Sequence, residues 1–217
     1  MYNLLLKELK LGVNPFFYVL PLLTGALMLI PGWLYLIVLL YFPFITIPNL
    51  FAGYRSQNDL FFSVLMPVTK KDIVKARLLT VVILELLHIV IAVIYGLIHI
   101  RIYPNLRYLF FSPTIGFWGI GFMMFGIFNL IMITMYYKTA YKFGPATIVS
   151  TVAAILFATL AEWLGIKNLF IYNLYKGTGA DNLLLQITLL LIGIVIFAIL
   201  NIITYKISIR LFEKVDI

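Results

Sequence analysis

Apolar residues fill this chain in long blocks, and short polar segments that carry most of the charges separate these blocks. No charged side chain occurs between Leu11 and Tyr54. Because a helix needs about 20 apolar residues to cross a bilayer, this stretch can cross twice, with Pro31-Gly32 as the turn. The same criterion predicts six membrane spans: Phe16–Ile30, Trp33–Ala52, Leu78–Ile98, Pro113–Tyr136, Pro145–Leu164 and Leu183–Tyr205.

The fold class follows from the solvent that surrounds these spans. The lipid interior offers the backbone no hydrogen-bond partners, so each span is expected to be a helix. The sequence therefore predicts an all-α polytopic membrane protein with six transmembrane helices. It is expected to form one domain over residues 1–217.

A further short helix is predicted over residues 1–12, ahead of the first span. Its apolar face has i, i+3, i+4, i+7 spacing and its other face is polar; the apolar face holds Tyr2, Leu5, Leu6 and Leu9, and the polar face holds Asn3, Lys7, Glu8 and Lys10. This pattern is typical of a helix lying in the cytoplasmic membrane interface. Two roles are open for it, a membrane anchor and a mechanical element.

Composition supports the membrane class and sets the orientation. Charged residues make up only 11% of the chain, against about a quarter in soluble domains. Short basic loops stay on the cytoplasmic side. One set of segments holds twelve cations, Lys7, Lys10, Arg55, Lys70, Lys71, Lys75, Arg77, Lys138, Lys142, Lys206, Arg210 and Lys214, and the other holds Arg101, Arg107, Lys167 and Lys176. Both termini are therefore expected in the cytoplasm.

The net charge of +8 and the missing residue types exclude several classes of function. Topology and contact with anionic lipid headgroups account for the charge, so no nucleic-acid partner is expected. The chain has no cysteine, which removes thiol nucleophiles and cysteine-ligated metals. His88 and His99 are too few for a histidine-rich metal centre. No catalytic, metal or cofactor site is expected.

The first loop on the cytoplasmic side contains "RSQNDLFFSVLMP", which predicts a short amphipathic helix. One helical face is apolar, made of Leu60, Phe61, Val64 and Leu65. Asn58 or Asp59 is placed to cap its start, and Pro67 to end it. Such a helix must bury its apolar face against lipid or against a partner protein.

The segment that follows, Leu65-Met66-Pro67-Val68-Thr69-Lys70-Lys71-Asp72-Ile73-Val74-Lys75-Ala76-Arg77, resembles "LPVTKKDIVKAR" in membrane subunits (permeases) of ABC-2 type exporters. The resemblance is to small bacterial six-span permeases, including those for phenol-soluble modulins and for self-immunity to peptide antibiotics. Met66 interrupts the Leu-Pro pair, and Arg77 stands where a lysine is common. The usual acidic run before the segment is reduced to Asp59.

The resemblance implies a division of labour between chains in the bacterial cytoplasmic membrane. A second permease chain, identical or different, and two copies of an ABC ATPase would complete the transporter. Residues 58–68 would form the coupling helix that fits a groove on the ATPase, with contacts from Asn58, Asp59, Leu60, Phe61, Val64 and Leu65. The chain has no G-x-x-x-x-G-K-[ST] motif, so ATP and Mg²⁺ are expected on the partner.

The fifth predicted span has small residues at every fourth position, Ala146, Ser150, Ala154 and Ala158. Such a stripe lets transmembrane backbones approach closely. It could pack against another helix of the same chain or across a dimer. The resemblance favours a dimer contact made by the first and fifth spans.

Within the third predicted span, Glu85 lies eight residues past Arg77, or roughly 12 Å along a helix. His88 follows at i+3. Di-iron bundles use Glu-x-x-His but need a second such motif, which is absent here. Two alternatives stay open, a structural Glu85–His88 contact and a polar spot on a translocation path. Asn129, Gln186 and Asn201 are weaker candidates of the same kind.

The function best supported by sequence is therefore transport driven by a separate ATPase. The resemblance implies outward movement of an amphipathic or hydrophobic peptide. One alternative is a secondary transporter driven by protons through Glu85 and His88. Another is a peptide-immunity membrane protein without transport.

Overall fold

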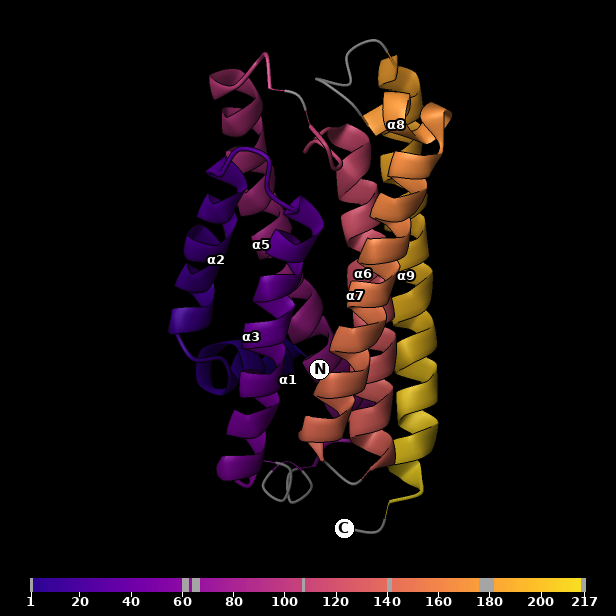
Figure 1. The fold of residues 1–217 in the computed structure, drawn as a ribbon. Coiled ribbons are helices and arrows are strands. Elements are labelled where there is room, and N and C mark those ends of the chain that lie inside the picture. The colour runs from indigo at the N-terminus through magenta and orange to yellow at the C-terminus, as the bar shows by residue number, and fades with distance from the viewer. Residues whose placement is uncertain are drawn as a thin grey trace.

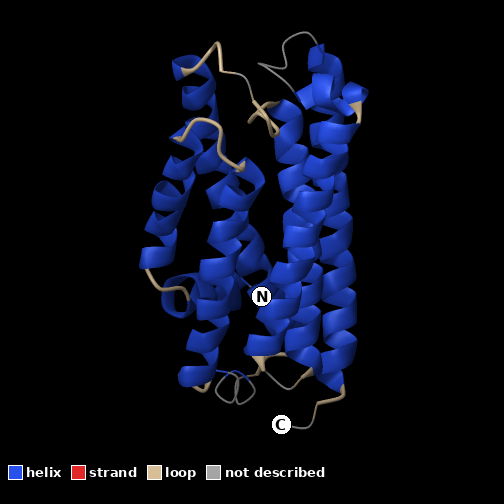
Figure 2. Ribbon diagram, viewed as in Figure 1, coloured by secondary structure: helices blue, strands red, loops and turns tan. Residues whose placement is uncertain are grey.

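The structure is a computed structural model that describes residues 2–59, 63, 67–106, 108–139, 142–175 and 182–215. Over these ranges it is built of helices joined by short loops, with no strand (Figure 2). The elements in chain order are α1 (Tyr2–Lys7), η1 (Glu8–Gly12), α2 (Phe16–Ala26), η2 (Leu27–Leu29), α3 (Tyr35–Ser56), α5 (Lys70–Ile102), α6 (Ile115–Lys138), α7 (Phe143–Lys167), α8 (Leu169–Tyr175) and α9 (Leu183–Glu213). The all-α prediction is confirmed for the described chain.

Five helices, α3, α5, α6, α7 and α9, are long and apolar enough to cross a membrane. The first predicted span differs from them. The 11 residues of α2 and the three of η2 extend roughly 20 Å, less than the hydrocarbon thickness of about 30 Å. The helical segment Tyr2–Gly12 meets Phe16–Leu29 at a bend of 69°, and the span count is six only if this bent pair is included.

The helices form two groups that pack side by side (Figure 1). One group contains α2, α3 and α5, and the other contains α6, α7 and α9. Contacts of α3 with α7 and of α5 with α9 join the groups. The central position of α6 is clear from its burial, since 72% of its most apolar window is covered, against 17% for α9.

Successive long helices run in opposite directions, which sorts the loops into two ends (Figure 1). Residues 56–77, 138–143 and 206–215 lie at the end that we call the basic end. Residues 29–35, 99–115 and 162–183 lie at the opposite end. The turn between α2 and α3 is at the predicted Pro31-Gly32, where Gly32 has a φ of 73°, a conformation that favours glycine.

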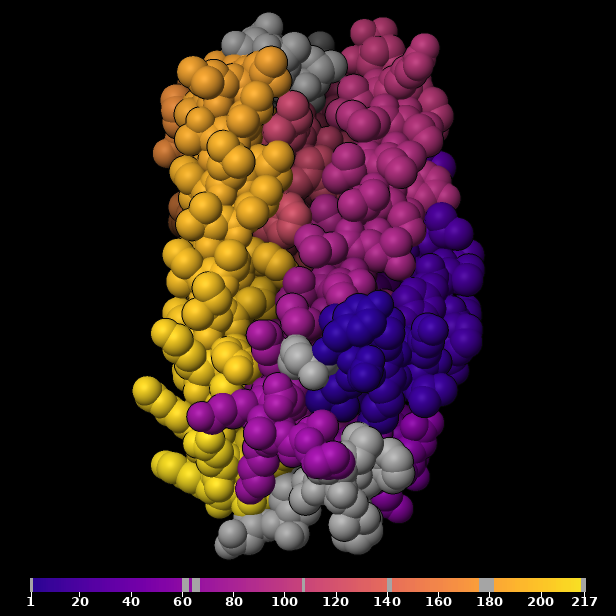
Figure 3. All heavy atoms as spheres, turned by 180° about the vertical axis from the view of Figure 1, so that it is seen from behind, coloured from indigo at the N-terminus to yellow at the C-terminus, as the bar shows by residue number. Residues whose placement is uncertain are grey.

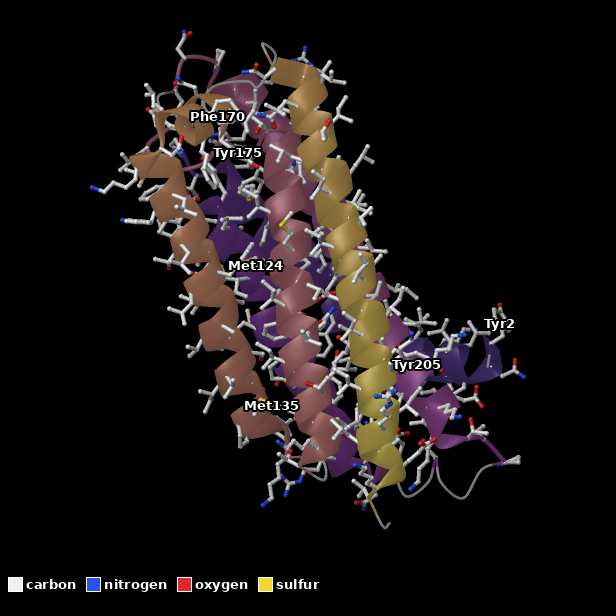
Figure 4. The ribbon with its side chains drawn as sticks, turned by 90° about the vertical axis from the view of Figure 1, so that its right-hand side faces the viewer. Tyr2, Met124, Met135, Phe170, Tyr175 and Tyr205 are labelled. Atoms are coloured by element: carbon white, nitrogen blue, oxygen red, sulfur yellow. The ribbon has the colours of Figure 1, made fainter. Side chains whose placement is uncertain are left out.

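The amino-terminal helix exists as predicted, but it buries a different face. Leu4 and Glu8 are buried, whereas Tyr2 is 72% exposed and projects away from the bundle (Figure 4). Leu5, Leu6 and Leu9 are only partly covered. From behind, α1 is seen against α5 (Figure 3). The predicted apolar face is therefore wrong for Tyr2, because the segment turns a carboxylate toward the protein interior.

The closest approach between long helices is that of α6 and α9. A Cβ atom built on Gly193 would lie 2.2 Å from the carbonyl oxygen of Gly119, and one built on Gly119 would lie 2.4 Å from that of Leu189. No side chain fits between the two backbones. The glycines therefore allow α6 and α9 to pack in direct backbone contact.

The small-residue stripe of α7 lies inside the chain. All four of its side chains are buried, Ala146, Ser150, Ala154 and Ala158, and α7 packs against α6 and α3. Because the chain itself covers them, they serve the first alternative, packing within one chain. The assignment of these four residues to a dimer contact is corrected accordingly.

Candidate functional site

The start of α5 is fixed at the basic end by polar contacts. Thr69 Oγ1 accepts a hydrogen bond of 3.2 Å from Asp72 N–H and donates one of 2.7 Å to Asp72 Oδ2, which forms a capping box. The hydrogen bond from Thr69 lowers the pKa of Asp72. Lys70 Nζ donates to the carbonyl oxygens of Phe212 and Val215, at 3.3 and 2.9 Å. Residues of the Thr69–Asp72 motif thus fix where α5 begins and hold the end of α9.

Arg77 lies two turns into α5 and is fully buried. Its Nη2 donates a hydrogen bond of 2.6 Å to Asp59 Oδ2, and its Nε lies 3.9 Å from Glu8 Oε1. Its guanidinium carbon is 4.4 Å from the ring centroid of Tyr54, a cation–π distance. One arginine therefore binds the amino-terminal helical segment, the loop after α3, and α3 itself.

Asp59 is the second centre of this group, and only 8% of it is exposed. Lys7 Nζ donates a hydrogen bond to Oδ1, and Ser63 Oγ donates one of 3.4 Å to Oδ2. Burial opposes ionisation, but the hydrogen bond from Lys7 and the charge of Arg77 outweigh it and lower the pKa of Asp59. We call Lys7, Glu8, Asp59 and Arg77 the Asp59 cluster.

The Asp59 cluster changes the predicted role of Asp59. Its carboxylate is occupied inside the chain, so in this conformation it anchors the loop and is not free to contact a partner. Asn58 is exposed and has a φ of 49°, a left-handed conformation that asparagine tolerates. The remaining predicted coupling residues, Leu60, Phe61, Val64 and Leu65, lie outside the described residues.

A second buried polar group lies midway along the helices and joins α5, α6 and α9. Asn129 Nδ2 donates to Glu85 Oε2 at 2.7 Å and to Asn201 Oδ1 at 3.2 Å. Asn201 Nδ2 in turn donates to the Phe197 carbonyl at 2.9 Å. Glu85, Asn129 and Asn201 are thus brought together as predicted for a set, and in this chain they link three helices.

His88 is separated from that group. Its ring stacks on Phe42 with centroids 4.6 Å apart, and its Nδ1 lies 3.4 Å from Thr24 Oγ1. No Glu85–His88 bond is present among the described contacts, so the first alternative for this pair is wrong. Searched over the same residues, the chain has no group of three or more His, Cys, Asp or Glu side chains placed to hold a metal ion.

Gln186 behaves as a buried amide was expected to behave, by bonding its neighbours. Its Oε1 accepts a hydrogen bond of 2.5 Å from Gly116 N–H, and its Nε2 donates to the Leu174 carbonyl. It therefore ties α9 to α6 and to α8 at the opposite end.

Sequence reasoning missed Glu162, which is 6% exposed. Its Oε2 accepts a hydrogen bond of 3.1 Å from Phe111 N–H, and its Oε1 is buried with no hydrogen-bond partner among the described residues. The small-residue stripe held the signal, because its spacing of four, continued past Ala158, reaches Glu162. Sequence reasoning also missed the burial of Glu8 and Arg77, for which the sequence held no comparable signal.

Comparison with known proteins adds the family. A family model described as "ABC-2 family transporter protein" matches residues 3–213. Neither the curated proteins nor the solved structures include a significant match. The match covers nearly the whole chain, including both buried polar groups, and the helical membrane architecture agrees with it. The chain belongs to the ABC-2 transporter family.

Proposed function

We propose that this chain is the permease subunit of an ATP-driven exporter that carries amphipathic or hydrophobic peptides outward. Membership in the ABC-2 family makes it the membrane component of a transporter that works with an ABC ATPase. The match over residues 3–213 is the observation that carries this proposal. The small six-span permeases that its Leu65–Arg77 segment resembles support the peptide substrate.

The Asp59 cluster supports the site of coupling. Asp59 stands at the start of the segment 58–68, and its carboxylate binds Lys7 before the segment and Arg77 after it. A force applied to that segment by an ATPase would therefore reach both the amino-terminal helix and α5. Removing charge from such a buried group costs several kcal/mol, so the connection would persist as the loop moves.

The proposed assembly contains two permease chains and two ATPase chains. With the stripe of α7 buried inside one chain, the pairing surface has to be sought among exposed apolar side chains. Both α2 and α7 expose such residues, for example Leu22, Leu23, Val152 and Leu156. This keeps the first and fifth spans as the proposed contact, through other residues than those first assigned.

The proposal is tested with inside-out vesicles that contain the chain and the ATPase subunit of its native host. We expect uptake of an amphipathic helical peptide that requires ATP and continues when the proton gradient is collapsed. Phe61→Asp should abolish both uptake and co-purification of the ATPase, because an apolar groove cannot bury an unpaired charge. Lys142→Ala, in the other loop of the basic end, is the matched control and should retain both.

The same vesicles separate the rival functions. Glu85→Gln keeps the shape and can still accept from Asn129 Nδ2, so ATP-driven uptake should fall only modestly. Uptake that needs the proton gradient, ignores ATP and disappears in Glu85→Gln would contradict the proposal and favour the proton-driven transporter. Peptide binding without any uptake would favour the immunity protein.

A further inference from the structure

A cavity of about 250 Å³ lies between α3 and α7 near the opposite end of the bundle. The two helices run side by side there (Figure 1). Its walls are almost entirely apolar and include Leu36, Ile37, Phe110 and Trp163. A single water occupies about 30 Å³, so the cavity has room for a group several times larger than a water.

Glu162 contributes a carboxylate to this apolar wall. The Phe111 N–H occupies one carboxylate oxygen, Oε2, at 3.1 Å. The other, Oε1, is buried and has no hydrogen-bond partner within the described part of the chain. None of the residues that line the cavity carries a positive charge. The site therefore combines an apolar chamber with a carboxylate oxygen that lacks a donor.

The chemistry of a complementary ligand follows from these two features. An apolar wall accepts a methylene chain, and an unpaired carboxylate oxygen accepts a hydrogen bond most strongly from a cation. A purely apolar ligand would leave Oε1 without a donor, which is unfavourable in a buried site. An anionic ligand would be repelled. An alkylammonium group satisfies both the wall and the carboxylate.

We propose that this cavity binds the alkylammonium side chain of a lysine in an amphipathic peptide, with the ammonium donating to Glu162 Oε1. The four-carbon stem of lysine lies along the apolar wall in this arrangement. That the peptide is the transported substrate rests on the proposed function. The cavity lies far along the bundle from the Asp59 cluster, so peptide binding here is separate from coupling.

The test measures binding to the chain alone, in phosphatidylcholine nanodiscs without an ATPase. Trp33→Phe and Trp118→Phe leave Trp163, in the cavity wall, as the fluorescence reporter, since the chain has three tryptophans. The probes are n-octylammonium and n-octanol, which share the chain and differ in the charge. We expect octylammonium to bind at least tenfold more tightly than octanol.

Two variants and one control locate the site. Glu162→Gln should abolish the preference for octylammonium over octanol. Thr159→Phe, at an exposed position that lines the cavity, should fill it and weaken binding of both probes. Glu213→Gln changes a half-exposed carboxylate at the basic end and should behave as the parent. Equal affinities for the two probes, or a preference that survives Glu162→Gln, would overturn the proposal.

The occupant is identified by competition. An amphipathic helical peptide with one lysine should displace octylammonium, and the same peptide with norleucine at that position should not. Loss of probe binding when phosphatidylethanolamine replaces phosphatidylcholine would instead identify a lipid headgroup and reject the peptide assignment. Because no ATPase is present, failure here leaves ATP-driven transport intact, whereas failure of transport with normal binding would reject only the proposed function.

Discussion

At the scale of single residues, the most informative side chains are charges that the chain buries. Arg77 is fully covered and Asp59 is 8% exposed, yet both belong to a segment whose composition suggests a solvated loop. A buried charge is tolerated when an opposite charge and hydrogen bonds replace its water. Asp59 and Arg77 supply this for each other at 2.6 Å, so neither can be changed alone without exposing the cost of the other.

Asp59→Asn removes the negative charge with little change of shape, which leaves Arg77 buried beside Glu8 alone. Loss of one partner of a buried ion pair typically costs about 3–5 kcal/mol. We expect a clear fall in the midpoint of thermal unfolding, followed by circular dichroism in detergent.

Glu213→Gln is the matched control for that substitution. It breaks an ion pair with Lys71 whose side chains are 64% and 50% exposed and whose atoms lie 3.9 Å apart. Exposed pairs contribute about 0–1 kcal/mol, so the unfolding midpoint should hardly move. Equal shifts in the two variants would show that the Asp59 cluster is not a stabilising group.

At the scale of helices, hydrophobic length predicted where the long elements are, but not which faces they share. The α6–α9 contact depends on Gly119 and Gly193, and a glycine within an apolar block does not reveal its partner. The stripe of α7 was visible because its spacing repeats, although the same spacing serves contacts within a chain and between chains. Pairing depends on three-dimensional fit, which a single sequence does not encode locally.

Gly193→Ala tests the backbone contact between α6 and α9. Its methyl group would lie 2.2 Å from the Gly119 carbonyl oxygen, too close for any rotamer to relieve. The helices must separate, and the resulting loss of packing is expected to cost about 1–3 kcal/mol. The measurement is again the unfolding midpoint in detergent.

Gly53→Ala provides the comparison within α3. A Cβ atom there meets nothing within 4 Å, and replacing a helical glycine by alanine usually stabilises by about 0.4–1 kcal/mol. The two alanine substitutions should therefore act in opposite directions. Destabilisation by both would mean that helix pairing is not what Gly193 provides.

At the scale of the whole molecule, charge distribution predicted the two ends of the bundle. The structure gathers the loops with most cations at one end, as the sequence predicted. The count treats all cations as headgroup-facing, however, and Arg77 is buried while Lys7 binds Asp59. Sequence could not separate these two from the rest, because their partners lie 18 and 52 residues away along the chain.

Membrane orientation is directly testable because the chain has no cysteine. Lys142→Cys places one thiol at the basic end, and Leu169→Cys places one at the opposite end, where Leu169 is 73% exposed. Since basic loops stay inside, an impermeant maleimide should label intact cells only at Leu169→Cys. Permeabilised cells should be labelled at both positions, and the reverse pattern in intact cells would invert the orientation.

The unbroken length of α5 has a mechanical consequence. Its 33 residues extend about 50 Å, with Arg77 near one end and, near the other, His99, whose Nε2 lies 3.0 Å from the Tyr35 hydroxyl. A straight rod that pivots near its middle moves its two ends in antiphase, and a tilt of about 5° displaces each by about 2 Å. Such a lever lets one membrane face open as the other closes, without any sliding between helices.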